Sequence, residues 1–215
     1  MRKLKRKSFL TILGIIILII AITLVSKITY AFFISQHGVT TTGDIDVTSK
    51  IVDKLTFTLG DAIAINATST TLPENGSNIQ DSTTATATLV AGNANDSATF
   101  SYDTNIIISN NTFTYTNVNT PEIILTVEDI TDPLNITEVD SLGNLTYGTY
   151  NGVTGFDITE ETGTFTITNS ISALMNETVN KTLRVTVTYL NLTIDQSANF
   201  GHSLGINVQM EEHSN

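Results

Sequence analysis

Apolar residues and threonines alternate with a period of two along most of this chain. Leu55, Phe57 and Leu59 are separated by threonines, and the pattern recurs in the stretches 83–91 and 183–189. Because successive side chains of a β-strand point to opposite faces, this pattern predicts strands with one buried and one solvated face. Threonine suits such strands, since its branched β-carbon fits the pleat.

The predicted strands are short, and turn signals separate them. Asn151-Gly152 lies between two of them, and Asn-Gly tolerates the positive φ angles of a two-residue hairpin turn. Strands do not alternate with helical stretches, which disfavours a parallel sheet. The pattern predicts an all-β fold, namely an antiparallel Ig-like or jelly-roll-like β-sandwich of about 8–10 strands. Within it, we expect a strand at 113–115, a helical turn at 170–179 and the longest strand at 183–189.

The first 34 residues have a different composition from the rest. Met1 to Lys7 contains five basic residues and no acid, and an apolar run from Phe9 to Val25 follows. A helix of such residues suits a bilayer, because its backbone polar groups are satisfied internally. The positive cluster stays on the cytoplasmic side, so the remainder of the chain is expected to be exported. One N-terminal hydrophobic helix is therefore predicted before the sandwich.

Two interpretations of residues 1–34 stay open. As a signal peptide, the basic head and apolar run end in a small-residue site, with cleavage between Ala31 and Phe32 and release of a secreted protein. As a signal anchor, the segment from Phe9 to Ile34 exceeds the roughly 20 residues that span a bilayer. That anchor would give a single-pass cell-membrane protein with an extracellular C-terminal domain.

The exported part divides into a polar linker and one domain. Residues 35–50 are threonine-rich and are expected to form a linker that ends in an edge strand, and residues 51–212 form the extracytoplasmic β-sandwich. Beyond Ile34 only four basic residues oppose all 21 acids, a net charge of −17, and such a surface repels nucleic acid. The chain has no cysteine, so disulfides are excluded. An exported, cysteine-free β domain is more typical of bacteria, particularly Gram-positive ones, than of animals.

No combination of residues predicts catalysis. The three histidines, His37, His202 and His213, fall in the linker, a polar loop and the terminal tail, and no Gly-x-Ser-x-Gly turn accompanies them. We therefore predict that the protein is not an enzyme, and we assign no catalytic or cofactor-binding residue.

Two groups of acidic residues are candidates for a metal site. Both groups fall in predicted turns. The first consists of Glu128, Asp129 and Asp132, and the second of Asp157, Glu160 and Glu161. Calcium is the metal that takes oxygen ligands from such loops, but no Asp-x-Asp-x-Asp-Gly loop is present. Turn-forming acids account for the same pattern, so no metal ligand is assigned.

The N-terminal region carries a family resemblance. Two short motifs, separated by a polar stretch, are Thr29-Tyr30-Ala31-Phe32 and Thr42-Gly43-Asp44-Ile45-Asp46-Val47. This region resembles the N-terminal part of the TasA/camelysin group of Gram-positive secreted matrix proteins. That resemblance implies secretion, a jelly-roll-like sandwich, and fibres in which an N-terminal strand completes the next subunit's sheet. The long middle insertions of the group have no clear counterpart here. Gly155-Phe156-Asp157-Ile158 and the stretch 185–191 also resemble surface β-sandwich proteins of Firmicutes.

The expected function is that of an exported bacterial cell-surface β-sandwich with a structural, matrix or adhesive role. Its expected partners are the membrane, through the N-terminal helix, and a second copy, a host or matrix protein, or a glycan. The alternative is a tethered extracellular module that binds carbohydrate or protein. Tyr115, Tyr147 and Tyr150 would then supply the contact platform.

Overall fold

The computed structural model describes residues 52–68, 76–93 and 95–213, all within the compact unit Lys50–Asn215. The expectations for the apolar run from Phe9 to Val25, the cleavage site at Ala31 and Phe32, and the linker 35–50 lie outside these residues. Within the described ranges, no helix is long and apolar enough to cross a membrane.

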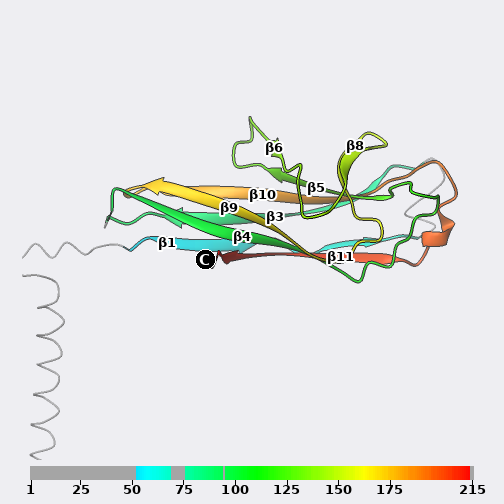
Figure 1. Cartoon of the computed structure of the whole chain (residues 1–215), viewed down its shortest axis with the longest axis horizontal. Coiled ribbons are helices and arrows are strands. Elements are labelled where there is room, and N and C mark those ends of the chain that lie inside the picture. Colours follow the sequence, from blue (N-terminus) through cyan, green and yellow to red (C-terminus); the bar gives the residue numbers. More distant parts are fainter. Residues whose placement is uncertain (1–51, 69–75, 94, 214–215) are drawn as a thin grey trace, which may run out of the picture. The chain divides into compact units, whose positions relative to one another are not determined.

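Eleven strands of the described chain form two antiparallel sheets (Figure 1). In spatial order, sheet A contains β1 (Lys54–Leu59), β3 (Ile79–Val90), β10 (Thr178–Tyr189), β5 (Ile123–Asp129), β8 (Val153–Asp157) and β7 (Tyr147–Tyr150), and β6 (Thr137–Glu138) also pairs with β5. Sheet B contains β2 (Ile63–Asn66), β11 (Ser203–Glu212), β4 (Ser97–Ser109) and β9 (Gly163–Leu174). One turn of 3-10 helix, η1 (Ser197–Asn199), precedes β11. The prediction of an all-β, antiparallel fold is confirmed, whereas the described chain has eleven strands and not about 8–10, the two-residue β6 among them.

The strand pairs are nested along the chain. β2 pairs with β11, β3 with β10, β4 with β9, and β5 with β8. The two halves of the domain thus form one long hairpin, and successive pairs alternate between the two sheets. This winding leaves β2 and β9 at the edges of sheet B, and β1 and β7 at the edges of sheet A.

The core consists of the side chains that face inward from both sheets, as the period-two pattern requires. Ile106 of β4 and Val185 of β10 belong to the larger apolar cluster, and both are fully buried. A smaller cluster places Ala85 and Ala87 of β3 together with Tyr102 of β4. The threonines between the alanines of β3 lie on the opposite, outer face of sheet A.

The stretch 113–115 does not form a strand, so that prediction is wrong. Phe113 is buried in the larger cluster, but its amide donates to Oδ1 of Asn111 at 3.1 Å and not to a neighbouring strand. A side-chain hydrogen bond from asparagine replaces the sheet ladder here. The apolar character of Phe113 reflects burial and not strand formation.

The predicted helical turn at 170–179 is also wrong. These residues form the end of β9, a turn, and the start of β10. Asn176 takes a left-handed conformation with φ of 63°, which asparagine tolerates better than most residues. The amides of Met175 and Asn176 donate to the carbonyls of Asp96 and Gly92, which fixes the turn. The longest described strand is β4 with 13 residues, one more than β10, which contains the expected stretch 183–189.

Candidate functional site: an open sheet edge and a polar groove

β9 forms one edge of sheet B, and β4 is its only partner among the described strands. Apart from this ladder, no backbone hydrogen bond between described residues involves the stretch 163–173. In an antiparallel edge strand, roughly every second residue directs its amide and carbonyl away from the partner. β9 therefore presents a row of unpaired backbone groups along residues 163–173. At its end, the Leu174 amide donates to Oε2 of Glu177, and the Leu174 carbonyl accepts the Glu177 amide.

This edge lacks the usual protection against further pairing. Natural edge strands carry charges, prolines or bulges that block an added strand, whereas β9 (GTFTITNSISAL) contains neither a charge nor a proline. The opposite edge of sheet B differs. β2 has only four residues, and the Asp81 carboxylate accepts the Ala64 amide at 3.0 Å. Sheet B is thus capped at one edge and open at the other.

Polar cross-strand bonds hold β9 in register with β4 on the outer face of sheet B. The Thr166 hydroxyl donates to Oδ1 of Asn105, and the Thr168 hydroxyl donates to Oδ1 of Asp103, both at 2.7 Å. On the inner face, Phe165 is buried in the core. Both faces of the strand are therefore fixed, and only its free edge is unpartnered.

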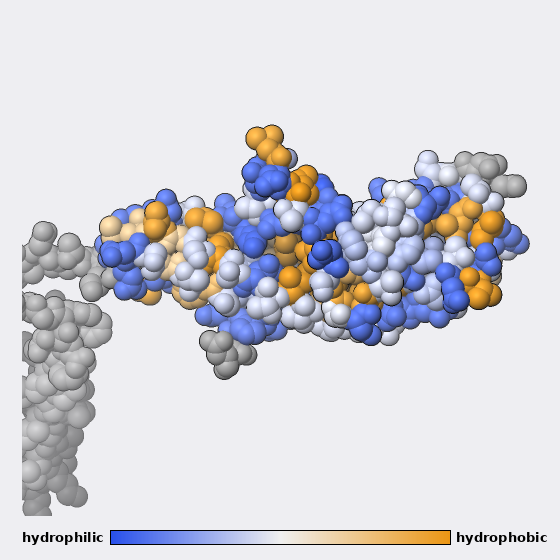
Figure 2. Space-filling model, turned by 45° about the horizontal axis from the view of Figure 1, so that its top comes forward, coloured by the Kyte–Doolittle hydropathy of each residue, from blue (hydrophilic) through white to orange (hydrophobic). Residues whose placement is uncertain are grey.

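Exposed apolar side chains do not gather into one docking surface on the face shown in Figure 2. The hydrophobic colour lies there in separate small groups. Leu134 and Val118, with 96% and 84% exposure, are the most exposed large apolar residues of the described chain, and they lie in different loops. Singly exposed apolar residues are ordinary for a protein surface. The backbone edge of β9 is therefore a more specific contact feature than any apolar area of that face.

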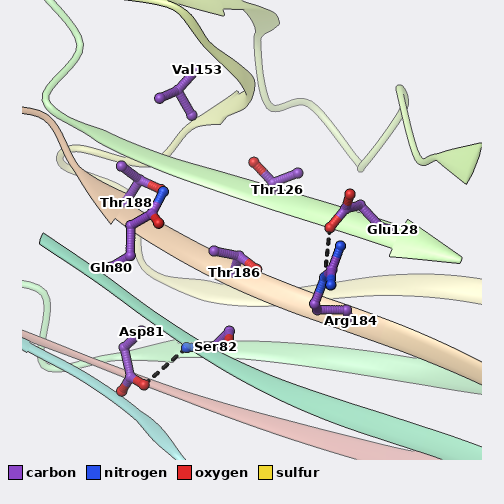
Figure 3. Close-up of a pocket in the computed structure, with 9 residues that line it drawn as sticks. All are labelled: Gln80, Asp81, Ser82, Thr126, Glu128, Val153, Arg184, Thr186 and Thr188. Carbon is purple, nitrogen blue, oxygen red and sulfur yellow. Dashed lines mark hydrogen bonds and ion pairs between the residues drawn. The ribbon is translucent and has the colours of Figure 1, made fainter. Parts of the chain in front are cut away.

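The second candidate is a groove of about 480 Å³ on the outer face of sheet A (Figure 3). The strand register places Ser82 of β3, Thr186 of β10 and Thr126 of β5 in one row across its floor. In the next row, Nε2 of Gln80 donates to Oγ1 of Thr188 at 2.9 Å. Hydroxyl and amide groups thus dominate the floor.

An ion pair lies at one end of the groove. Nε of Arg184 donates to Oε2 of Glu128 at 2.8 Å, across the β10–β5 ladder. The hydrogen bond to this carboxylate raises the pKa of Arg184. Because the bond uses Nε, the terminal N–H groups of the guanidinium remain available to a ligand.

The β7–β8 hairpin forms a wall beside the groove, and a glycine allows it to leave the plane of the sheet. β8 pairs with β5 only at Phe156 and Asp157, so the ladder ends before Gly155. Figure 1 shows β8 rising away from β5. A Cβ at Gly155 would lie 2.5 Å from the carbonyl oxygen of Leu125 and 2.9 Å from Cγ2 of Ile124. No side chain fits at so close an approach of two backbones.

Two hydrogen bonds fix the hairpin in this position. Oγ1 of Thr126 donates to the Thr154 carbonyl at 2.7 Å, and Nδ2 of Asn151 at the hairpin turn donates to the Asn191 carbonyl at 3.1 Å. Val153 consequently lies across the groove from the threonines of the floor (Figure 3). It supplies one apolar contact opposite a polar surface.

The three tyrosines expected as a contact platform are engaged within the fold, and none of them lines the groove. The Tyr115 hydroxyl donates to Asp157 at 2.8 Å, and the Tyr147 hydroxyl donates to Glu138 at 2.6 Å. The Tyr147 ring also packs edge-on against the buried Phe156 ring, with 5.0 Å between centroids. The half-buried Tyr150 donates to the Thr146 carbonyl at 3.4 Å.

These environments predict a delayed alkaline titration of the folded protein. The hydrogen bond to Glu138 raises the pKa of Tyr147 to about 12, and burial raises the pKa of Tyr102 to about 12, from an ordinary 10.0. Above pH 10 the unfolded chain therefore binds fewer protons than the folded one, so stability falls as the pH rises through this window. The phenolate absorbance of the full chain should lag behind that of the chain in urea. Tyr102→Phe and Tyr147→Phe should each remove one late-titrating group, and joint titration of all tyrosines near pH 10 would contradict the assignment.

The described histidines do not form a catalytic triad. The His202 ring contacts the Thr112 carbonyl and packs near Phe113, with 6.2 Å between centroids. Nδ1 of His213 lies 2.8 Å from Oδ2 of Asp103, a contact that the sequence pattern missed because it placed His213 in a tail. This hydrogen bond and that from Thr168 lower the pKa of Asp103. No serine hydroxyl within the described residues forms a hydrogen bond with either ring. His37 lies outside them.

Residues of both acidic groups that are candidates for calcium have other partners. Glu128 binds Arg184, Asp129 lies 3.6 Å from Nζ of Lys181, and Asp132 accepts the Leu134 amide at 2.9 Å. In the second group, Asp157 accepts the Tyr115 hydroxyl. Across the described ranges, no three His, Cys, Asp or Glu side chains are placed to hold a metal ion together.

The sequence pattern did not single out Glu122, whose carboxylate is buried. Glu122 has 0% exposure and forms no ion pair with any described basic residue. The sequence feature that could have indicated its burial is its position between Pro121 and the apolar stretch 123–125. Its carboxylate accepts hydrogen bonds from groups on three separate segments: the amide of Thr116 (2.6 Å), Nε2 of Gln196 (2.8 Å), Nδ2 of Asn199 (3.1 Å) and the hydroxyl of Tyr189 (3.3 Å).

No known family model matches the chain, and no curated protein matches it. Function is therefore inferred from the geometry of the β9 edge and of the sheet A groove.

Proposed function

We propose that this chain is an exported bacterial cell-surface protein with a structural, matrix or adhesive role and no catalysis, assembled by main-chain pairing at the β9 edge. The observation that carries the proposal is the unpaired, uncharged edge of β9 along residues 163–173. Strand addition to such an edge obtains its affinity from main-chain hydrogen bonds. The strand to be added is the segment 43–47 of another copy, in which Ile45 and Val47 alternate with acids.

The winding of the sheets supports this proposal. The nested pairs of β2–β5 with β8–β11 contribute four strands to each of the two sheets. Eight strands in two sheets are what a jelly-roll-like sandwich requires. A jelly-roll-like sandwich is also what the TasA/camelysin resemblance at 29–47 implies. The same resemblance implies assembly through an N-terminal strand, and β9 offers a place for that strand.

The N-terminal segment supports placement outside the cell. Its basic head and apolar run direct the acidic domain across the membrane. Cleavage between Ala31 and Phe32 would release a secreted subunit with a free N-terminal strand. Retention of the segment would give a tethered subunit, and N-terminal sequencing of the mature protein separates the two.

Lysines on β9 are expected to prevent assembly. Thr164 and Ser170 are exposed, and their side chains form no hydrogen bond with another described residue, so Thr164→Lys/Ser170→Lys places charge at the edge without removing a contact. Charged edge residues oppose strand addition, and we expect roughly a tenfold or greater loss of polymer. Light scattering and electron microscopy of the mature protein measure the change.

The matched control adds the same two charges to interior strands. Thr84→Lys/Ser101→Lys modifies exposed positions of β3 and β4, both of which have partners on each side, and it should assemble normally. Deletion of residues 32–48 should abolish polymers and leave a folded domain, because it removes the proposed donor strand. Equal assembly of the β9 variant and the control would contradict the role of this edge.

A further inference from the structure

The groove on sheet A presents hydrogen-bonding groups that the fold itself does not use. The hydroxyls of Ser82 and Thr186 form no hydrogen bond with any described residue, although they lie side by side in the central row of the floor. The bond between Arg184 and Glu128 joins Nε to Oε2. It therefore does not use the terminal N–H groups of Arg184 or the second carboxylate oxygen of Glu128. Donors and acceptors therefore converge on one concave surface.

We propose that this groove binds a short, neutral saccharide. Sugar hydroxyls both donate and accept, and they match a floor in which hydroxyls alternate with an amide and an ion pair. Val153 on the opposite wall supplies an apolar contact for the C–H groups of a sugar ring (Figure 3). This site lies on a different sheet from the β9 edge, so the inference goes beyond the proposed assembly function and does not depend on it.

Charge favours a neutral ligand over an anionic one. Glu128 compensates the one cationic side chain of the groove, Arg184, and Asp81 adds a further negative charge to the lining. The chain beyond Ile34 carries a net charge of −17. Uronic, sialylated or phosphorylated glycans would therefore meet repulsion at long range, and no unpaired cation of the groove would offset it.

The floor also disfavours an extended peptide. The floor consists of β3, β10 and β5, and β10 pairs with β3 on one side and with β5 on the other. The backbone groups of β10 are therefore already used in hydrogen bonds to these two strands. A peptide strand needs an exposed backbone edge, or apolar pockets for alternate side chains. Here only polar side chains and Val153 face the ligand.

The size of the groove agrees with a short oligosaccharide. Its volume of about 480 Å³ falls within the range of roughly 300–1,000 Å³ that is common for small-molecule sites. Thr188, with 1% exposure, and Gln80 close the floor beneath the hairpin. The pre-formed wall means that binding requires no rearrangement of the sheet.

The test uses the full chain in a detergent without a sugar headgroup, applied to an array of neutral oligosaccharides, anionic oligosaccharides and peptides. We expect binding confined to neutral oligosaccharides. For the best of them, titration calorimetry with Thr186→Val and with Ser82→Ala should show roughly a tenfold loss of affinity for each, because each change removes one ligand-facing hydroxyl. Thermal unfolding of both variants should match that of the unmodified protein, since neither hydroxyl supports the fold.

Thr84→Val is the matched control. Thr84 is exposed on the same face of β3, two residues after Ser82, and it does not line the groove. Loss of its hydroxyl should therefore leave the affinity unchanged. The proposal is overturned if no neutral oligosaccharide binds, if peptides or anionic glycans bind in their place, or if Thr84→Val weakens binding as much as Thr186→Val. These outcomes are independent of polymer formation, which the β9 variants measure.

Discussion

Replacing Glu122 with alanine is expected to lower the free energy of unfolding by roughly 3 kcal/mol, because several buried donors lose their acceptor together. Gln196 and Asn199 both donate amide hydrogens to this carboxylate, and both are buried where water cannot replace it. For a domain of this size, the change corresponds to a fall in Tm of roughly 6 to 12 °C. The chain contains six tyrosines and no tryptophan, so tyrosine fluorescence can follow unfolding of the full chain in urea and on heating.

Two variants separate this role from a general effect of removing a glutamate. Glu122→Gln keeps the size of the side chain but sets an NH₂ group against the donors, and we expect a loss of roughly 2 kcal/mol. Glu212→Ala removes an exposed carboxylate at the end of β11 and should change stability by less than about 0.5 kcal/mol. If Glu122→Ala were no more destabilising than Glu212→Ala, the carboxylate would not be what holds these loops together.

The physical reason for the large effect is that Glu122 connects elements that the ladders leave apart. Its carboxylate bonds reach the loop at Thr116, the end of β10 at Tyr189 and the 3-10 turn at Asn199. Its own amide donates to the Thr159 hydroxyl at 2.9 Å, beyond the end of β8. Substitution should therefore loosen this end of the domain locally, which amide hydrogen exchange would detect at these segments before global unfolding.

The local sequence pattern was sufficient to predict strands in which apolar and polar residues alternate strictly. β3 carries Ala85, Ala87 and Leu89 between threonines, and all three are buried as the period predicts. The stretch 170–179 failed because its turn depends on Asn176, whose amide donates to a carbonyl far along the chain. A tertiary contact overrode a weak local preference there.

The two candidate sites could not be predicted, because both depend on strand order. The central row of the groove brings Ser82, Thr126 and Thr186 together from three strands, and no spacing in the sequence reports that register. Phe165 and Ile167 alternate with threonines, which favours a strand over this part of β9, but its place at an edge follows only from the nested pairing. The hydroxyl partners of the tyrosines could not be predicted for a related reason, since the fold brings Glu138 to Tyr147 and Asp157 to Tyr115.

Gly155→Ala is expected to cost roughly 2 to 3 kcal/mol of stability, at the upper end of what overpacking produces. The new Cβ would lie 2.5 Å from the Leu125 carbonyl oxygen, which belongs to a strand paired on both sides and cannot withdraw. The hairpin must therefore move outward, and the bond from Thr126 to the Thr154 carbonyl should lengthen or break. Urea unfolding measures the loss, and near-ultraviolet circular dichroism should report a changed environment for Tyr147, which packs on Phe156.

Gly205→Ala is the matched control for this change. Gly205 also lies in a strand, but the nearest atoms to its added Cβ are 3.5 and 3.6 Å away, an ordinary contact distance. We expect an effect below about 1 kcal/mol, because nothing has to shift. Since the hairpin is also the wall of the groove, Gly155→Ala should weaken saccharide binding at temperatures where the domain is still folded, whereas Gly205→Ala should not. Unchanged stability and unchanged Tyr147 ellipticity in Gly155→Ala would show that β8 does not approach β5 this closely.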